Sequence, residues 1–323
     1  MKKAALVFLM FALTLAAACA PVYESRVDYA MGAEVTQKIW GAGEDCLKAA
    51  FDAIVALEED VSYRKDGAVA LLNSGKTVNG GDAYGIIVKS VELWRETGGA
   101  YDITVLPLVR AWGFDTDSPR LPGESEIASA LSLTGSENVV FGPDGVYLAN
   151  GAQIDLSAAG KGAACQKAVE IYKARGASGG VVTVGGSVGV FGNKNGSPFR
   201  IAVRSPFDPA DAIAVLTLTD TYISTSGSYE KRFEKDGVEY HHLLDPSTGC
   251  PVQNGLISVT VVYSDGALSD MLSSACFCMG MEKSLPLLTK YSASALFVRE
   301  DGAVFVTKEL APYVECESYE VLP

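Results

Sequence analysis

Apolar residues recur at helical spacing through the first half of the chain. The clearest case is the segment 44–59, whose apolar side chains fall on one face of a helix and predict packing against a core. Glycines that follow two of the other apolar segments mark the ends of helices. The pattern predicts helices over residues 44–59, 82–97, 124–131 and 160–175.

From Val181 onward, short β-branched and aliphatic runs between turn residues predict strands. A helical pattern over 268–279 interrupts these runs and ends before Gly280. Because helices and strands do not alternate regularly, the order favours an α+β fold with antiparallel sheets over a doubly wound parallel sheet. The predicted strands cover residues 181–184, 199–203, 213–218, 256–262, 295–298 and 303–306.

The first residues have the order of a bacterial lipoprotein signal. Two lysines precede an apolar run that is too short for a typical spanning helix, and small residues then lead directly into Cys19. We therefore expect 1–18 to be removed, Cys19 to carry a lipid, 19–30 to be a tether and 31–323 to form the working domain. This predicts an extracytoplasmic protein of the bacterial cell envelope, anchored to the membrane by its lipid. A soluble secreted protein is the alternative.

The chain is strongly acidic, with 26 Lys plus Arg against 39 Asp plus Glu and a formal net charge of −13. Sequence-independent nucleic-acid binding needs a basic surface, so no nucleic-acid partner is expected. An anionic ligand would have to be held by local cations, helix N-termini or a metal ion. The cysteines do not have the spacing of a zinc ribbon.

Both histidines of the chain, His241 and His242, lie between a small hydroxyl-and-glycine loop at 225–227 and the Asp245-Pro246 turn. Two imidazoles are too few for a histidine-rich metal site, so a metal here would rely mainly on oxygen ligands. Histidine is also the side chain best suited to move a proton near neutral pH. In an extended segment the two rings point to opposite sides, and a purely structural role is the alternative.

Two glycine-containing segments offer room for a phosphorylated ligand. In 154–162 a strand end leads through small residues into a helix that carries Lys161 near its start, and a helix N-terminus with a lysine attracts phosphate. The glycine spacing is not that of a P-loop. Gly185-Gly186 follows a predicted strand and allows a second close approach to the backbone. A tight connection is the alternative in both places.

Asp270 and Ser274 stand four residues apart in the predicted helix 268–279, so their oxygens project from one face. A carboxylate, a hydroxyl and a backbone carbonyl would form part of an oxygen shell for Mg²⁺, which water and a ligand phosphate complete. Capping of the helix is the alternative.

Taken together, these motifs resemble the ApbE family of flavin transferases, the FAD:protein FMN transferases. The resemblance extends from Met31 to the last predicted strands, and the motifs follow one another in the family's order. They are Met31-Gly32, Ser62-Tyr63 with Asn73, Tyr101-Asp102-Ile103-Thr104 with Pro107-Leu108 and Trp112-Gly113-Phe114, Ile154-Asp155-Leu156 with Lys161-Gly162, Gly185-Gly186, Thr225-Ser226-Gly227, His242 to Pro251, and Asp270 with Ser274.

The resemblance implies an α+β architecture related to the T-fold, with FAD in a cleft between two lobes. By the family's motifs, Mg²⁺ would be held by the backbone carbonyl of Ala158 and by the side chains of Asp270 and Ser274. Ser274 stands where the family usually has Thr, and Gln166 where many members have Asp. The residues implied in FAD binding are Met31, Tyr63, Ala100, Tyr101, Asp102, Asp155, Lys161 and the backbone near Leu244.

The resemblance also implies an activity. It is the Mg²⁺-dependent transfer of the FMN part of FAD to a Thr or Ser hydroxyl of an exported or membrane-bound redox flavoprotein, with release of AMP. We expect His242 to be the base that accepts the hydroxyl proton. Its alternative role is to orient the phosphate or the following turn. Hydrolysis of FAD to FMN and AMP, and flavin binding without chemistry, are the alternative functions.

Overall fold

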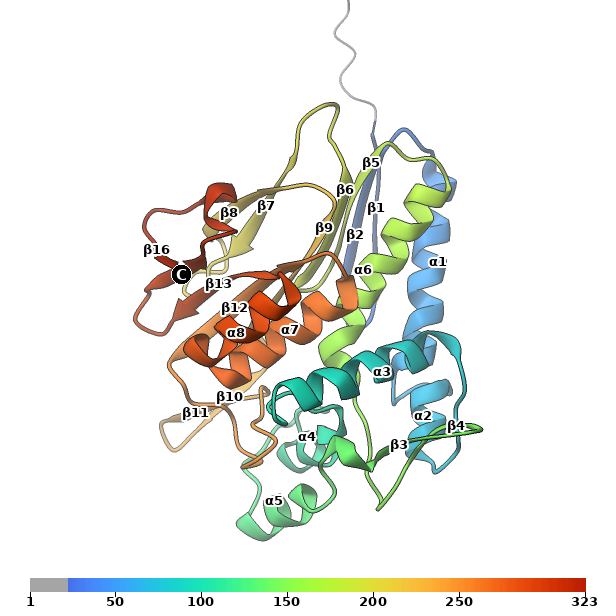
Figure 1. The fold of residues 1–323 in the computed structure, drawn as a ribbon, viewed down its shortest axis with the longest axis vertical. Helices are drawn as coiled ribbons and strands as arrows, with labels where there is room; N and C mark the ends of the chain where they lie inside the picture. The colour runs from blue at the N-terminus through green and yellow to red at the C-terminus, as the bar shows by residue number, and fades with distance from the viewer. Residues whose placement is uncertain (1–22) are drawn as a thin grey trace, which may run out of the picture.

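A nine-stranded sheet runs through the centre of the structure, a computed structural model that describes residues 23–323 (Figure 1). Neighbouring strands are antiparallel except for the last pair, which is parallel. The α+β fold with antiparallel sheets is therefore confirmed. In order across the sheet the strands are β1 (Tyr23–Ala30), β2 (Ala33–Trp40), β5 (Gly179–Val184), β6 (Ser187–Gly192), β9 (Thr221–Gly227), β12 (Leu256–Tyr263), β13 (Ser294–Arg299), β14 (Val304–Thr307) and β16 (Glu320–Leu322).

Three smaller sheets complete the β structure. A three-stranded sheet consists of β15 (Val314–Glu315), β8 (Ala212–Leu218) and β7 (Phe199–Arg204). It covers one face of the large sheet through a cluster of buried aliphatic side chains from both sheets. The other two are hairpins, formed by β3 (Val139–Gly142) with β4 (Gly145–Leu148) and by β10 (Arg232–Lys235) with β11 (Val238–His241).

Helices cover the opposite face of the large sheet, where α6 and α7 lie directly on the strands (Figure 1). The ends of the predicted helices agree with the structure to within a few residues. The helices are α1 (Glu44–Val61), α2 (Ala68–Asn73), α3 (Gly81–Glu96), α4 (Leu106–Trp112), α5 (Glu124–Leu131), α6 (Ser157–Ala174), α7 (Gly266–Met279) and α8 (Met281–Tyr291). None of the helices among residues 23–323 has both the length and the apolar character that crossing a bilayer requires.

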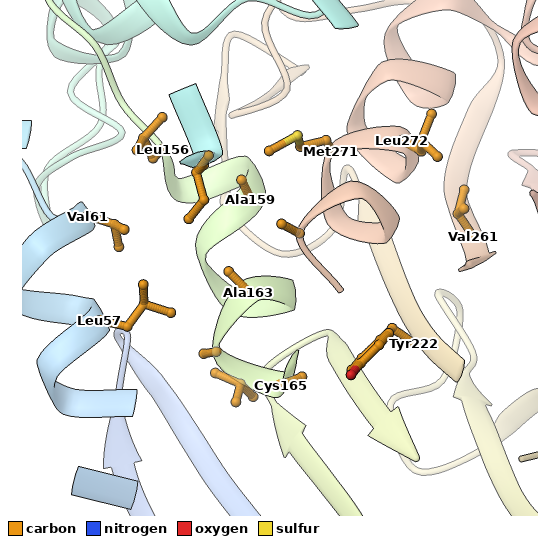
Figure 2. Packing of buried hydrophobic residues seen from close by; sticks show 14 of the residues in the cluster. Leu57, Val61, Leu156, Ala159, Ala163, Cys165, Tyr222, Val261, Met271 and Leu272 are labelled. Atoms are coloured by element: carbon orange, nitrogen blue, oxygen red, sulfur yellow. The ribbon is translucent and has the colours of Figure 1, made fainter. Parts of the chain in front are cut away.

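The main core lies between this helical layer and the sheet (Figure 2). Leu57 of α1, Ala163 of α6 and Met271 of α7 meet there, and Tyr222 of β9 closes the core from the sheet side. Each of these side chains is at most 9% exposed, so their burial removes apolar surface from water and stabilises the packing of α6 between its neighbours.

Two glycines allow α6 and α7 to cross in direct backbone contact. A Cβ on Gly162 would overlap the carbonyl oxygen of Gly266, and a Cβ on Gly266 would overlap the carbonyl oxygen of Gly162. Any residue with a side chain at either position would push the helices apart. The crossing brings Asp270 of α7 against the first turns of α6.

The prediction of a tether over 19–30 is wrong for its second part, because Tyr23–Ala30 forms β1 and pairs along its whole length with β2. Its side chains alternate between the two faces of the sheet. The charged residues lie on the partly buried face and the apolar residues on the exposed face, which is the reverse of the usual pattern. Arg26 and Asp28 pair with each other on the side of α1, while Val27 and Tyr29 face solvent. The predicted signal at 1–18 and Cys19 lie outside the described residues.

One further expectation needs correction. The hydroxyl-and-glycine segment 225–227 is the end of strand β9 and not a loop. The buried segment after Gly99 forms a 3₁₀ turn over Ile103–Val105 that continues into α4.

Candidate active site

A cavity of about 550 Å³ collects the described residues that the sequence singles out for binding or chemistry. Its walls come from the β1–β2 turn, the segments after α1 and before α4, the start of α6, the end of β9, the segment after β11, and α7. The predicted residues that line it are Met31, Tyr63, Ala100, Tyr101, Asp102, Asp155, Ala158, Lys161, His242, Leu244, Asp270 and Ser274.

Asp270 places a negative charge in a nearly water-free part of this cavity, since the residue is only 4% exposed. Its Oδ2 accepts a hydrogen bond of 2.9 Å from the backbone amide of Gly162. Burial raises the pKa of Asp270, while Lys161 and the amides at the start of α6 oppose that rise. Among residues 23–323 no lysine or arginine pairs with this carboxylate directly, so a cation bound here would compensate its buried charge.

The surroundings of Asp270 fit the oxygen shell expected for Mg²⁺. Ser274 also lines the cavity, and its hydroxyl lies 2.9 Å from that of Ser226 on β9. The Gly162 amide, which in a regular helix donates to the carbonyl of Ala158, is engaged by Asp270, and this leaves the Ala158 carbonyl more available as a ligand. No cluster of three His, Cys, Asp or Glu side chains suited to a metal occurs in the described part of the chain. A metal here would therefore keep several waters and use ligand phosphate, as Mg²⁺ does.

Carboxylates engage two backbone amides in the first turns of α6. Asp155 Oδ1 accepts from the amide of Ser157 at 2.8 Å, and Asp270 accepts from the amide of Gly162. The amides of Ala159 and Gly160 donate to the carbonyl of Leu156, and Lys161 adds a cation that lines the cavity, so phosphate binding here stays a prediction. Gly185, whose φ is +54°, leaves room for the side chain of Lys161, because a Cβ at position 185 would lie 3.2 Å from Lys161 Cδ.

Aromatic and apolar side chains form another part of the cavity wall. The guanidinium carbons of Arg64 and Arg110 lie 5.3 and 5.8 Å from the centroid of the Tyr63 ring. Tyr101 is 4% exposed, and burial raises the pKa of its hydroxyl. Met31 has a left-handed backbone, with φ of 57°, in the β1–β2 turn. This wall suits a flat aromatic ligand.

Asp102 lines the cavity, but its carboxylate is already satisfied by the protein. It accepts hydrogen bonds of 2.5 to 3.0 Å from the backbone amides and hydroxyls of Thr104 and Ser136. The side chain thereby fixes the 3₁₀ turn before α4. Because the carboxylate is engaged in this way, a ligand at this position would contact the backbone of Asp102.

His242 follows β11 and presents one ring nitrogen for chemistry. Its backbone amide donates to the carbonyl of Lys231 at 3.0 Å, and its Nδ1 lies 3.3 Å from the same oxygen. A carbonyl only accepts, so Nδ1 carries the proton and Nε2 keeps a lone pair. Burial, with Lys161 and Lys231 next in importance, lowers the pKa of His242 to about 3. The ring is therefore neutral at pH 7, and the lone pair of Nε2 is unprotonated.

His241 has a different environment, as expected for the opposite side of an extended segment. It is 8% exposed, its Nε2 donates to the carbonyl of Val252 at 2.9 Å, and its ring packs edge-on against Phe277. Its contacts are structural, and it does not line the cavity.

The sequence interpretation missed several residues of the cavity. Lys231 supplies a second cation besides Lys161, Phe114 packs edge-on against His242, and Cys278 comes from the last turn of α7. Lys231 follows the 225–227 motif closely in the sequence, but its charge carries no signal of where it lies. Oxygen ligands, lysines and a neutral imidazole beside an aromatic wall are groups that can hold a phosphate ester and deprotonate a nucleophile.

Comparison with known proteins agrees with this arrangement. Residues 31–297 match the model of the ApbE family. The FAD:protein FMN transferase of Escherichia coli K12 is 30% identical over 259 residues, which cover 76% of this chain and 74% of that protein. The protein of the same name from Treponema pallidum is 31% identical over 264 residues, which cover 75% of this chain and 73% of that protein.

Solved structures give the same result. The ApbE protein of Thermotoga maritima superposes with a TM-score of 0.84 at 31% identity, covering 90% of this chain and 99% of that one. The flavinyl transferase ApbE of Pseudomonas stutzeri does so with a TM-score of 0.79 at 30% identity, covering 90% and 96%. The chain therefore belongs to the ApbE family, and the resemblance seen in its motifs is confirmed.

Proposed function

We propose that this chain is an FAD:protein FMN transferase that requires Mg²⁺ and releases AMP. The observation that carries the proposal is that one cavity joins the oxygen ligands around Asp270, the cation of Lys161, the neutral ring of His242 and an aromatic wall. Its volume of about 550 Å³ is in the range of sites for cofactor-sized ligands. Curated relatives bearing this name cover most of the chain.

The transfer replaces the phosphoanhydride bond of FAD by a phosphoester bond to the acceptor. The acceptor hydroxyl oxygen attacks the FMN phosphorus of FAD, the bond from that phosphorus to the bridging oxygen breaks, and AMP leaves with that oxygen. His242 Nε2 accepts the hydroxyl proton, while Lys161 balances phosphate charge. Mg²⁺ held by Asp270, Ser274 and the Ala158 carbonyl would supply further charge stabilisation on the phosphate oxygens.

A single assay separates this function from its alternatives. The domain is incubated with FAD, Mg²⁺ and a flavoprotein that carries a candidate Thr or Ser acceptor, and AMP release and protein-bound flavin fluorescence are followed together. AMP with labelled acceptor is expected. AMP without label would identify an FAD pyrophosphatase, and neither product would identify a flavin-binding protein without chemistry.

We further propose that the protein works at the bacterial cell envelope, attached through a lipid on Cys19, and that its acceptor is an exported or membrane-bound redox flavoprotein. The support is the order of basic, apolar and small residues before Cys19. A Cys19→Ser variant is expected to appear in the soluble fraction or to stay as unprocessed precursor. Mature variant protein that still needs detergent for extraction would contradict the anchor.

A further inference from the structure

We propose that Lys231 binds the pyrophosphate of FAD together with Lys161 and stabilises the charge on the departing AMP. This inference rests on the proposed function and adds a catalytic residue that the motifs do not mark. In an acidic protein with a net charge of −13, a polyanionic ligand depends on such local cations.

The position of Lys231 is fixed by the same contacts that fix the base. Lys231 lies between β9 and β10 and lines the cavity. Its carbonyl oxygen accepts from the backbone amide of His242 and from the ring Nδ1–H. The backbone of Lys231 and the ring of His242 are therefore held together, so the lysine is anchored next to the reacting groups.

The charge of Lys231 has no carboxylate partner among residues 23–323. The carboxylate of the preceding residue, Glu230, pairs with Arg204 instead. Lys161 is likewise without an ion pair among residues 23–323, and it lines the same cavity. Two uncompensated ammonium groups at one cavity favour an anion that satisfies both.

The electrostatic surroundings agree with this geometry. Lys231 is an exposed residue whose ammonium group is partly desolvated at the cavity. This partial burial, followed by repulsion from Lys161, lowers the pKa of Lys231, and attraction by Asp155 opposes the change. Arg64 lowers it further, while Asp115 raises it. An anion bound between the two lysines would relieve their repulsion, whereas an uncharged flavin ring would not. The phosphates are therefore the part of FAD that Lys231 recognises.

In the reaction, Lys231 acts as a fixed positive charge. As the bond between the FMN phosphorus and the bridging oxygen breaks, negative charge accumulates on the phosphate of AMP. An ammonium group that donates to this phosphate is favoured more strongly as the charge grows. A lowered pKa would equally suit a lysine acting as the base, so the test must separate a cation from a base.

Three variants make this separation. Lys231→Met removes the charge, Lys231→Arg keeps a charge that does not dissociate near neutral pH, and Lys235→Met removes an exposed lysine of β10 that does not line the cavity, as a control. Binding of riboflavin, FMN and FAD is measured by quenching of flavin fluorescence without divalent metal. Lys231→Met is expected to weaken FAD binding by about 10- to 100-fold, the usual effect of losing a hydrogen bond to a charged group. Riboflavin affinity should change less than about twofold, within ordinary surface effects, as should FAD affinity in Lys235→Met.

Turnover then distinguishes the remaining roles. Lys231→Arg is expected to keep most of the AMP release and labelling of the wild type, whereas Lys231→Met loses both. Equal weakening of riboflavin and FAD by Lys231→Met, or unchanged FAD affinity, would overturn the proposal. So would Lys231→Arg that binds FAD normally but is inactive, since that would make Lys231 a base. The binding measurements need no acceptor, so they test Lys231 even if the transferase assay fails.

Discussion

Replacing Asp270 by asparagine is expected to abolish FMN transfer while FAD remains bound. The carboxylate is the only charged side chain in the proposed oxygen shell, and the flavin contacts lie on other elements. Asn keeps the size of the side chain and an oxygen for the Gly162 amide, so the α6–α7 crossing should persist. A bound metal contributes several kcal/mol to a transfer of this kind, and 1.36 kcal/mol corresponds to tenfold, so a rate loss of about 10³-fold is expected.

The measurement has three parts: AMP release, flavin fluorescence without metal, and binding of Mn²⁺ as a spectroscopic probe in place of Mg²⁺. Asp265→Asn is the matched control, because Asp265 caps the same helix α7 and pairs with Lys89 but does not line the cavity. Transfer and Mn²⁺ affinity should survive in the control and be lost together in Asp270→Asn. Unchanged Mn²⁺ affinity in the latter variant would show that the metal lies elsewhere.

The sequence predicted those elements whose side chains follow a simple hydrophobic period. Strand β13 contains a continuous apolar run because both faces are buried, β12 is rich in β-branched and aliphatic residues, and α1 presents one apolar stripe to the core. Strand β9 escaped this reasoning because its buried face is lined by hydroxyl groups. Ser224 contacts Ser187 and Ser269, and Ser226 contacts two serines of α7. A polar residue that is buried against another polar residue has no signature in hydropathy.

The sequence predicted the parts of the candidate site that the family motifs mark. The structure shows what several of these motif residues do. Asn73 binds both the amide and the carbonyl of Ile154, at 2.7 and 2.9 Å, and so fixes the segment that leads into α6. This segment is irregular, so the prediction of a strand end at Ile154 is wrong. Trp112 donates to the carbonyl of Gly249 at 2.7 Å and thereby ties α4 to the turn after His242. These contacts join segments far apart in the sequence, so only the family's pattern, and not local propensity, reveals them.

The place of Lys231 in the cavity and the carboxylate contacts in the first turns of α6 could not be predicted from the sequence for a related reason. Whether a lysine faces a cavity depends on which strands flank it, and here β9 pairs with β6 and β12 from distant parts of the chain. Whether helix amides are available to a phosphate depends on competing acceptors, and Asp270 reaches α6 only through the glycine crossing. Charge and helix propensity are local, but the availability of a charged group is decided by tertiary packing.

His242→Ala is expected to lower the transfer rate by about 10²- to 10⁴-fold, the usual range for a lost general base, with little change in FAD affinity. The proton on Nδ1 is held by the Lys231 carbonyl, so Nε2 is the nitrogen available to the acceptor hydroxyl. The remaining activity should increase with pH, because an ionised acceptor replaces the missing base. His241→Gln is the matched control: its amide nitrogen can still donate to Val252, and it should retain near-normal activity.

The pH profile of the unmodified protein gives an independent test of the same assignment. A histidine with its usual pKa near 6.5 would be protonated below that pH, and kcat/KM would fall there. Burial and the two lysines lower the pKa of His242 to about 3, so kcat/KM should not fall as the pH decreases through 6.5. Removing one of these cations, as in Lys231→Met, favours the protonated ring, so an NMR titration should give His242 a higher pKa in this variant than in the unmodified protein. Equal losses in the His241 and His242 variants, or a His242 defect confined to FAD affinity, would return His242 to an orienting role.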